Sequence, residues 1–145
     1  MRLKTFAWYW LPVYLYMGLI YHLSAQSEPE VPSFLLLNDK VTHFFEYALL
    51  GLLLIRALKK EYISRHKDGI PALSGKFNLT GLKLIALLIA AAYGASDEFH
   101  QGFIIGRTAD FSDWLVDLYG SAFGSFFLLI PRDRLSFLTR KGPGK

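Results

Sequence analysis

The chain has 145 residues, of which 52% are hydrophobic and only 19% are charged, and its formal net charge at pH 7 is +4. A composition this apolar excludes intrinsic disorder, and the absence of cysteine excludes a disulfide scaffold. A very hydrophobic soluble domain or a membrane protein remains, and four membrane spans of about 20 residues each would use most of the apolar positions.

The first predicted element covers residues 6–23, a run without Asp, Glu, Lys or Arg. Its tryptophans and tyrosines are typical of the interfacial ends of membrane helices. Pro12 predicts a kink, which bundles embedded in lipid tolerate. Arg2 and Lys4 precede the run as in a signal peptide, but the bulky aromatic residues favour a retained membrane span.

Three further apolar stretches, at about residues 41–58, 79–95 and 111–130, are also long enough to cross a hydrocarbon core of about 30 Å. They are apolar around most of their circumference, unlike the one-sided surface helices of soluble proteins. The predicted fold is therefore all-α: one integral membrane domain over residues 1–145, built as a bundle of four transmembrane helices.

The distribution of charge predicts the orientation of the bundle. Of the 16 Lys and Arg residues, 14 lie near the N-terminus, in or beside a loop at residues 59–78, or in a tail at residues 131–145. Nine of the 12 Asp and Glu residues lie on the opposite side. Because positive residues collect on the cytoplasmic side, both termini are predicted to be cytoplasmic. The net charge thus indicates topology, and no nucleic-acid partner is expected.

The first group of polar residues lies at the start of the second span. Asp39, His43 and Glu46 are four and three residues apart, so they are predicted to share one helix face. Asp39 is also placed to cap the helix, and His43 has either a packing role or a functional one. Glu46 lies about 10 Å deeper than Asp39, where a charged carboxylate in lipid is costly, so it is expected to face the bundle or to be protonated.

The second group, at the end of the third span, contains Asp97, Glu98, His100 and Gln101. Two adjacent acids at a helix C-terminus oppose the helix dipole. They are therefore expected to be compensated by a metal, a basic partner or a proton, unless they are solvated loop residues. Arg107 is the predicted basic partner, because it is the only arginine in the outer half of the chain.

The third group enters the fourth span. Asp113 lies near the helix N-terminus, where the dipole favours an acid, but Asp117 lies one turn deeper, beyond the reach of that effect. Gly120 and Gly124 form a small-xxx-small stripe that allows another helix to approach closely. We assign these two glycines to helix packing and not to chemistry.

Many of these polar residues and glycines, with several of their neighbours, follow one another in a characteristic order and spacing over roughly residues 20–130. The residues of this pattern are Asp39, Lys40, His43, Tyr47, Gly51, Asp97, Glu98, Gln101, Phe103, Gly106, Arg107, Asp113, Gly120 and Gly124. This pattern resembles that of the VanZ family. Asp117 is a departure, since the family usually has Asn there. The resemblance implies a small multi-pass protein of the bacterial cytoplasmic (inner) membrane, related to one associated with teicoplanin resistance. It implies a role in cell-envelope physiology or in glycopeptide resistance.

The polar residues on the outer side are predicted to form a binding site for an anionic lipid or a lipid-linked cell-wall intermediate. Arg107 is suited to hold a phosphate or carboxylate in bidentate fashion. The predicted ligand-binding residues are Asp39, Lys40, His43, Glu46, Tyr47, Asp97, Glu98, Gln101, Arg107, Asp113 and Asp117.

Other functions stay open at this point. A membrane-embedded hydrolase or transferase would use acid–base groups tuned by burial, for which the candidates are His43, Glu46, Asp97, Glu98 and Asp113. A small ion-coupled transporter would use the buried acids to carry the ion. No cofactor is evident, but carboxylates together with histidine can hold a divalent metal.

Overall fold

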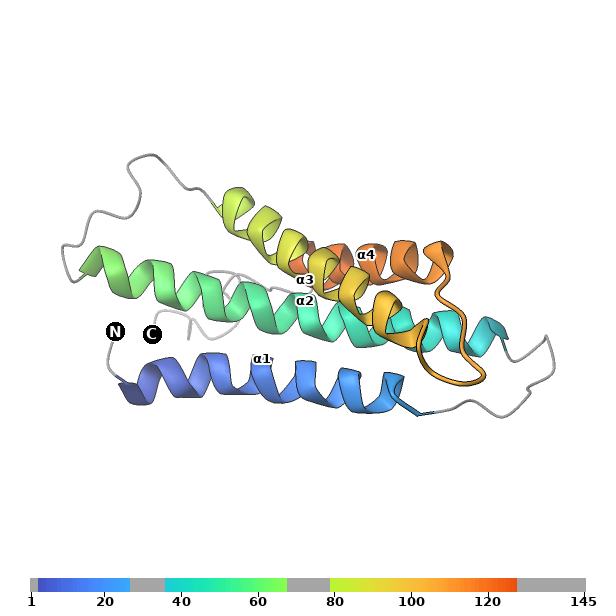
Figure 1. Cartoon of the computed structure of the whole chain (residues 1–145). Helices are drawn as coiled ribbons and strands as arrows, with labels where there is room; N and C mark the ends of the chain where they lie inside the picture. The colour runs from blue at the N-terminus through green and yellow to red at the C-terminus, as the bar shows by residue number, and fades with distance from the viewer. Residues whose placement is uncertain (1–2, 27–35, 68–78, 128–145) are drawn as a thin grey trace, which may run out of the picture.

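The computed structural model describes residues 3–26, 36–67 and 79–127, except for the side chains of residues 36–39 and 65–67. Within these residues the chain forms four α-helices and no strand, which confirms the predicted all-α fold. Figure 1 shows that successive helices run in opposite directions. The helices are α1 (Leu3–Ser24), α2 (Leu36–Lys67), α3 (Leu79–Gln101) and α4 (Phe111–Phe126).

Two helices extend well beyond the predicted spans. α2 continues through residues 59–67, which were expected to begin a loop. These residues are mostly good helix formers and include neither Gly nor Pro, so the helix continues without interruption. α3 continues through residues 96–101 and therefore carries its acids inside its last turns. The predicted residues 128–130 of the fourth span, and the tail after them, lie outside the described residues.

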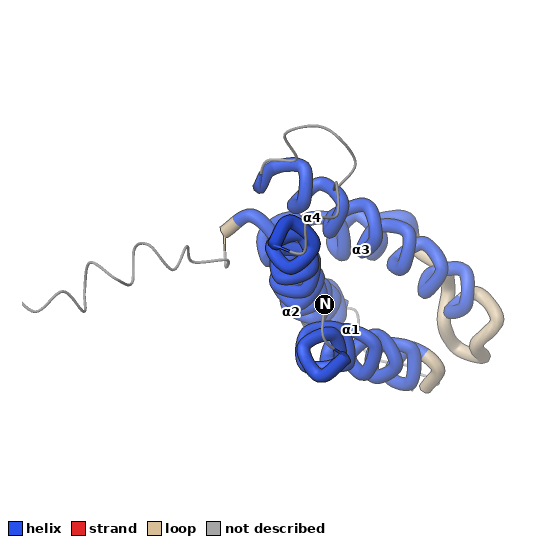
Figure 2. Tube along the Cα trace, turned by 90° about the vertical axis from the view of Figure 1, so that its left-hand side faces the viewer, coloured by secondary structure: helices blue, strands red, loops and turns tan. Residues whose placement is uncertain are grey.

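α2 is the central helix of the bundle. Figure 2 shows it between α1 and α4, and it contacts all three other helices. Its contact with α4 is the most extensive, and α3 packs on both α4 and α2. α1 packs mainly against α2. Side chains on opposite faces of α2 can therefore have entirely different neighbours.

Glycines allow α2 and α4 to approach closely. A Cβ atom added to Gly120 would overlap the backbone carbonyl of Phe44, and one added to Gly124 would overlap the carbonyl of Ala48. Gly51 of α2 makes the reciprocal approach to the backbone of α4. Only a residue without a side chain fits at these positions, so the spacing of small residues determines how near the two backbones lie.

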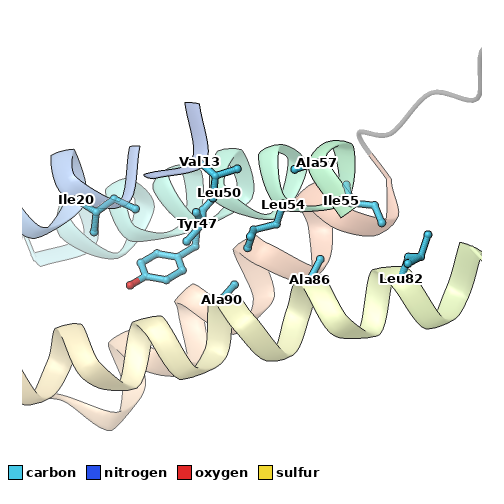
Figure 3. Close-up of a cluster of buried hydrophobic side chains, with 10 residues drawn as sticks. All are labelled: Val13, Ile20, Tyr47, Leu50, Leu54, Ile55, Ala57, Leu82, Ala86 and Ala90. Carbon is cyan, nitrogen blue, oxygen red and sulfur yellow. The ribbon is translucent and has the colours of Figure 1, made fainter. Parts of the chain in front are cut away.

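The apolar core joins α1, α2 and α3, as Figure 3 shows. The alanines of α3 let this helix lie near the larger side chains of α2. The ring of Tyr47 projects from α2 toward α3. The buried apolar residues are Val13, Ile20, Tyr47, Leu50, Leu54, Ile55, Ala57, Leu82, Ala86 and Ala90.

Much apolar surface remains outside this core. Two helical segments, Lys40–Ser64 and Leu79–Gln101, are long and apolar enough to cross a membrane. Large apolar side chains are also exposed on the outer faces of all four helices. Exposed apolar surface of this extent is typical of contact with a membrane or a protein partner. Examples are Leu11, Leu15, Leu19, Phe45, Leu49, Leu84, Leu88, Tyr119 and Phe123.

Candidate functional site

α1 and α3 end, and α2 and α4 begin, at the same end of the bundle (Figure 1). Several polar side chains at this end are buried. The alternating direction of the helices brings the ends of α1 and α3 beside the starts of α2 and α4. Residues that are far apart in the sequence are thereby collected at one depth. We call this set the buried polar cluster; its members are Ser24, His43, Tyr47, Asp97, Glu98, Gln101 and Asp117.

His43 of α2 and Asp117 of α4 form a buried pair. The His43 Nδ1 atom lies 3.0 Å from the Asp117 Oδ1 atom. The next residue of α2, Phe44, contacts Gly120, one turn after Asp117. The close approach of the two backbones therefore allows the short aspartate side chain to reach the imidazole. The second carboxylate oxygen of Asp117, Oδ2, has no hydrogen-bond partner in the described part of the chain.

Asp97 connects α3 to the end of α1. Its Oδ2 atom accepts a hydrogen bond from the Ser24 hydroxyl at 2.8 Å and another from the Gln101 amide at 3.3 Å. Gln101 lies four residues after Asp97, so the second bond runs along one face of the helix. The Oδ1 atom of Asp97 is buried without a partner among the described residues.

Glu98 connects α3 to the start of α4. Its Oε2 atom accepts the backbone N–H of Asp110 at 2.9 Å, and its buried Oε1 atom has no partner within the described ranges. Glu98, His43 and Asp117 each offer one potential metal-ligand atom, and these atoms all lie within 4.8 Å of one another. Three different helices therefore contribute to one compact set of acid and imidazole groups.

Tyr47 lies beside these acids. Its side chain is buried and interacts electrostatically with Asp117, Asp97 and Glu98, while its hydroxyl has no hydrogen-bond partner among the described residues. A buried polar atom without a partner is costly, and the cost is larger for a charged carboxylate. Protons, a cation or a ligand with hydrogen-bond donors would each reduce this cost.

A second set of contacts lies beside the buried polar cluster, around Lys40 at the start of α2. The Lys40 ammonium donates to the Ser112 hydroxyl at 2.7 Å and to the Asp113 carboxylate, and it forms an ion pair with Asp110. Asp110 caps α4 by accepting the backbone N–H and the hydroxyl of Ser112. The Ser112 hydrogen bonds, with the nearby Lys40 charge, hold the pKa of Asp110 below its usual value. Lys40 therefore joins the beginnings of α2 and α4.

Two predicted site residues contact other parts of the chain. Glu46, expected on the same face as His43, is half-buried and interacts electrostatically with Tyr16 of α1. Arg107, expected to compensate the acids of α3, donates its Nε–H to the carbonyl oxygen of Gln26 at 3.0 Å. The hydrogen bonds described for those acids come from a serine, a glutamine and a backbone N–H.

Asp39 and His100 are the remaining polar residues predicted to lie near the site. The side chain of Asp39, at the start of α2, lies outside the described residues. His100 stacks on the ring of Tyr21, with 4.5 Å between the ring centroids, and it interacts electrostatically with Asp97. His100 therefore borders the buried polar cluster from the side of α1.

Sequence reasoning missed two residues that shape the site. Ser24 ends an apolar run, and only the tertiary packing, in which α1 and α3 run in the same direction and end at the same level, places it beside Asp97. Gly94 lies one turn before the acids of α3, and a Cβ atom there would come within 3.1 Å of Asp117 Oδ2. Both residues could have been found from their position along the bundle axis, since each lies at the level of a polar residue on another helix, Asp97 for Ser24 and Asp117 for Gly94.

Comparison with known proteins supports the resemblance seen in the sequence. The family model VanZ/LLP1 matches residues 5–132, which include the whole buried polar cluster. Searches of the curated proteins and of the solved structures each returned no match. Since the family model spans most of the chain, the resemblance predicted from the polar motifs is confirmed. The chain belongs to the VanZ/LLP1 family.

Proposed function

We propose that the chain is a multi-pass protein of the bacterial cytoplasmic membrane, with both termini in the cytoplasm and the buried polar cluster near the outer surface. The two long apolar helices and the exposed apolar side chains support the membrane location. Basic residues support the orientation, because most of those on the described helices lie at the end opposite the cluster, with Lys40 as the exception. Those with described side chains at that opposite end are Lys4, Arg56, Lys59, Lys60 and Lys83.

At the buried polar cluster the protein binds the headgroup of an anionic lipid or of a lipid-linked cell-wall intermediate. The observation that carries this proposal is that exposed apolar side chains lie next to the buried polar cluster at this end of the bundle. The side chains of Phe99, Phe103, Ile105 and Phe111 are strongly exposed, from 69% at Phe111 to 88% at Ile105. We call these four residues the apolar edge. Glu98 directly precedes Phe99, so buried acids and exposed rings lie side by side.

An amphipathic ligand fits this arrangement. Its apolar chain would lie along the apolar edge, and its polar group would enter the cluster. The unpartnered carboxylate oxygens of Asp97, Glu98 and Asp117 accept hydrogen bonds, so they favour a headgroup with hydroxyl or amine donors. Arg107 and Lys40 supply positive charge for a phosphate or carboxylate on the same molecule.

Membership of the family links this proposal to the cell envelope. Binding an envelope lipid would serve ordinary envelope physiology or would change the response to glycopeptides such as teicoplanin. Bacteria that express the wild-type chain are then expected to tolerate more teicoplanin than bacteria that express the Asp117→Leu variant at the same level. Equal susceptibility of the two strains would restrict the role to envelope physiology.

Native mass spectrometry of the full chain with an extract of envelope lipids tests ligand binding. We expect a specific lipid on the wild-type chain and at least about tenfold less of it on Arg107→Ala, since a bidentate charged contact is lost. Glu61→Gln removes an acid from the opposite end of α2 and serves as the matched control. Retention of the same lipids by all three proteins would contradict a site at the cluster, and release of a lipid product would instead identify a hydrolase.

The absence of native cysteine makes the orientation directly testable. Thr108→Cys lies on the exposed connection between α3 and α4, and Lys4→Cys lies at the start of α1. In intact cells a membrane-impermeant maleimide is expected to label Thr108→Cys, and to label Lys4→Cys only after the cells are permeabilised. The reverse pattern would contradict the proposed orientation.

A further inference from the structure

We propose that His43, Glu98 and Asp117 form a binding site for a divalent transition-metal cation, of the zinc or manganese type. These side chains come from α2, α3 and α4 and are 5%, 7% and 0% exposed. Their potential ligand atoms lie within 4.8 Å of one another. With bonds of about 2.1 Å, a tetrahedral cation holds its ligand atoms about 3.4 Å apart, and an octahedral cation holds neighbouring ligand atoms about 3 Å apart. Side-chain movements of about 1–2 Å would therefore close the site.

The hydrogen bonds of the two carboxylates leave room for such a cation. Asp117 Oδ1 and His43 Nδ1 are 3.0 Å apart, which fits a hydrogen bond and equally fits two neighbouring ligands of one metal ion. Glu98 accepts one backbone N–H through Oε2. One oxygen of each acid, Oε1 of Glu98 and Oδ2 of Asp117, is buried without a partner in the described part of the chain.

Charge leads to the same conclusion. Two carboxylates from separate helices are held close together away from water, where their mutual repulsion is poorly screened. The backbone N–H carries no full positive charge, and the His43 imidazole carries at most one, so these groups do not neutralise both acids. A doubly charged cation neutralises both acids in a single step and also uses oxygens that otherwise lack partners.

The packing around Asp117 is tight on the side of α3. Gly94 faces this carboxylate from α3, and a Cβ atom at Gly94 would lie 3.1 Å from Oδ2 of Asp117 and 3.3 Å from the Tyr47 ring. Any larger side chain at position 94 would take up the volume beside that oxygen. The glycine therefore lets α3, which also carries Glu98, approach this carboxylate closely.

The donor set selects the type of metal. An imidazole with two carboxylates suits zinc or manganese, whereas calcium and magnesium prefer sites made of oxygen ligands alone. Three protein ligands leave a coordination position for one further group. A phosphate oxygen of the proposed envelope lipid would fill that position, and only this last step rests on the proposed function. Such a bridge would let an acidic cluster bind an anionic headgroup.

The test uses the purified full chain in detergent, stripped with EDTA and then equilibrated with zinc or manganese chloride alone. Elemental analysis is expected to find one cation per chain, and calorimetry is expected to show at least about 100-fold weaker binding for His43→Ala and for Glu98→Gln. The matched control Glu61→Gln is expected to bind as the wild type does. A folded wild-type chain that retains no cation, or binding that the two variants leave unchanged, would overturn the proposal.

A second measurement avoids dependence on variants that fold poorly. The unfolding temperature of the wild-type chain is expected to rise when zinc or manganese is added and to fall when EDTA is added, because the metal binds only the folded site. No change in either direction would contradict the site. Lipid capture with and without EDTA separates the two proposals. A bound cation without a lipid contradicts only the proposed function, and a lipid captured equally with and without EDTA contradicts only the bridge from the metal to the phosphate. Absence of cation binding in the wild-type chain contradicts the metal site itself.

Discussion

At one end of the bundle, positive side chains lie against aromatic rings near the surface. The Arg56 guanidinium lies 4.7 Å from the centre of the Tyr9 ring, and the Lys83 ammonium lies 4.9 Å from the centre of the Phe126 ring. Lys83 also donates to the carbonyl oxygen of Phe126. These long side chains stay half-buried, so their charged ends reach the surface while their stems cover apolar atoms.

At the other end, short acidic side chains are fully enclosed. Asp97, Glu98 and Asp117 cannot extend to the surface, and each keeps one oxygen without a partner among the described residues. The flexible basic side chains at the first end can keep their charged groups hydrated, so their desolvation costs little free energy. The acids at the second end depend on neighbouring side chains for their hydrogen bonds. In the proposed function, the basic end sets the orientation and the acidic end binds the ligand. The following experiments test this difference between the two ends.

The largest expected effect comes from breaking the buried pair. His43→Leu leaves Asp117 buried without its imidazole partner and is expected to lower the free energy of unfolding by about 3–5 kcal/mol. Lys83→Leu at the basic end is expected to cost about 1 kcal/mol or less. Both values are measured by unfolding in detergent mixtures. Equal losses at the two ends would remove the contrast between them.

The double variant His43→Leu with Asp117→Leu checks the cause of that loss. Removing both partners replaces an uncompensated charge with apolar contacts, so most of the stability is expected to return. A double variant that is less stable than His43→Leu alone would show that the loss comes from packing and not from the buried charge.

The second largest effect on stability is expected from the close approach of α2 and α4, because this approach brings the buried side chains of the two helices together. Gly124→Ala would drive a Cβ atom into the backbone of Ala48 and is expected to destabilise the fold by about 2–3 kcal/mol. Gly18→Ala on α1 is the matched control, since nothing lies within 4 Å of the added atom. The control is expected to be neutral or slightly stabilising. Similar losses at both positions would contradict the proposed role of the close contact.

A smaller effect is expected from the link between α1 and the acidic end. Ser24→Ala removes a hydrogen bond to the buried carboxylate of Asp97 and is expected to cost about 1.5 kcal/mol. Ser96→Ala provides the control, because Ser96 is exposed and, among the described residues, its hydroxyl donates only to the carbonyl oxygen of Tyr93 in the same helix. The control is expected to change stability by less than about 0.5 kcal/mol. A neutral Ser24→Ala would show that α1 is not anchored through Asp97.

The smallest effect depends on pH and concerns the cap of α4. Because the folded pKa of Asp110 is lowered from its ordinary value of 3.8, its stabilisation is complete above that value and is lost as the pH falls through the lower folded pKa. The side chain is exposed, so the contribution is expected to be a few tenths of a kcal/mol. Asp110→Asn keeps a capping side chain and is expected to remove this difference between pH 7 and pH 3. Unchanged pH dependence in the variant would assign it to other acids.

Local patterns in the sequence were sufficient to predict the helices. Apolar runs and the distribution of basic residues are properties of neighbouring positions, so four helices and a basic side could be recognised without any tertiary contact. The spacing of Gly120 and Gly124 predicted a close helix neighbour for the same reason. The ends of the helices were less well predicted, because α2 and α3 continue into polar residues that propensity alone permits to be either helix or loop.

The sequence by itself determined that this protein is helical, apolar and asymmetric in charge, and it indicated which polar residues are candidates for a site. Only the tertiary structure decided which of those residues meet. His43 and Glu46 are three positions apart, yet one reaches Asp117 of α4 and the other interacts with Tyr16 of α1. The reason is that α2 is packed on several sides, so a modest rotation around its axis changes the neighbouring helix. The pairing of distant side chains depends on that packing, which no local pattern in the sequence records.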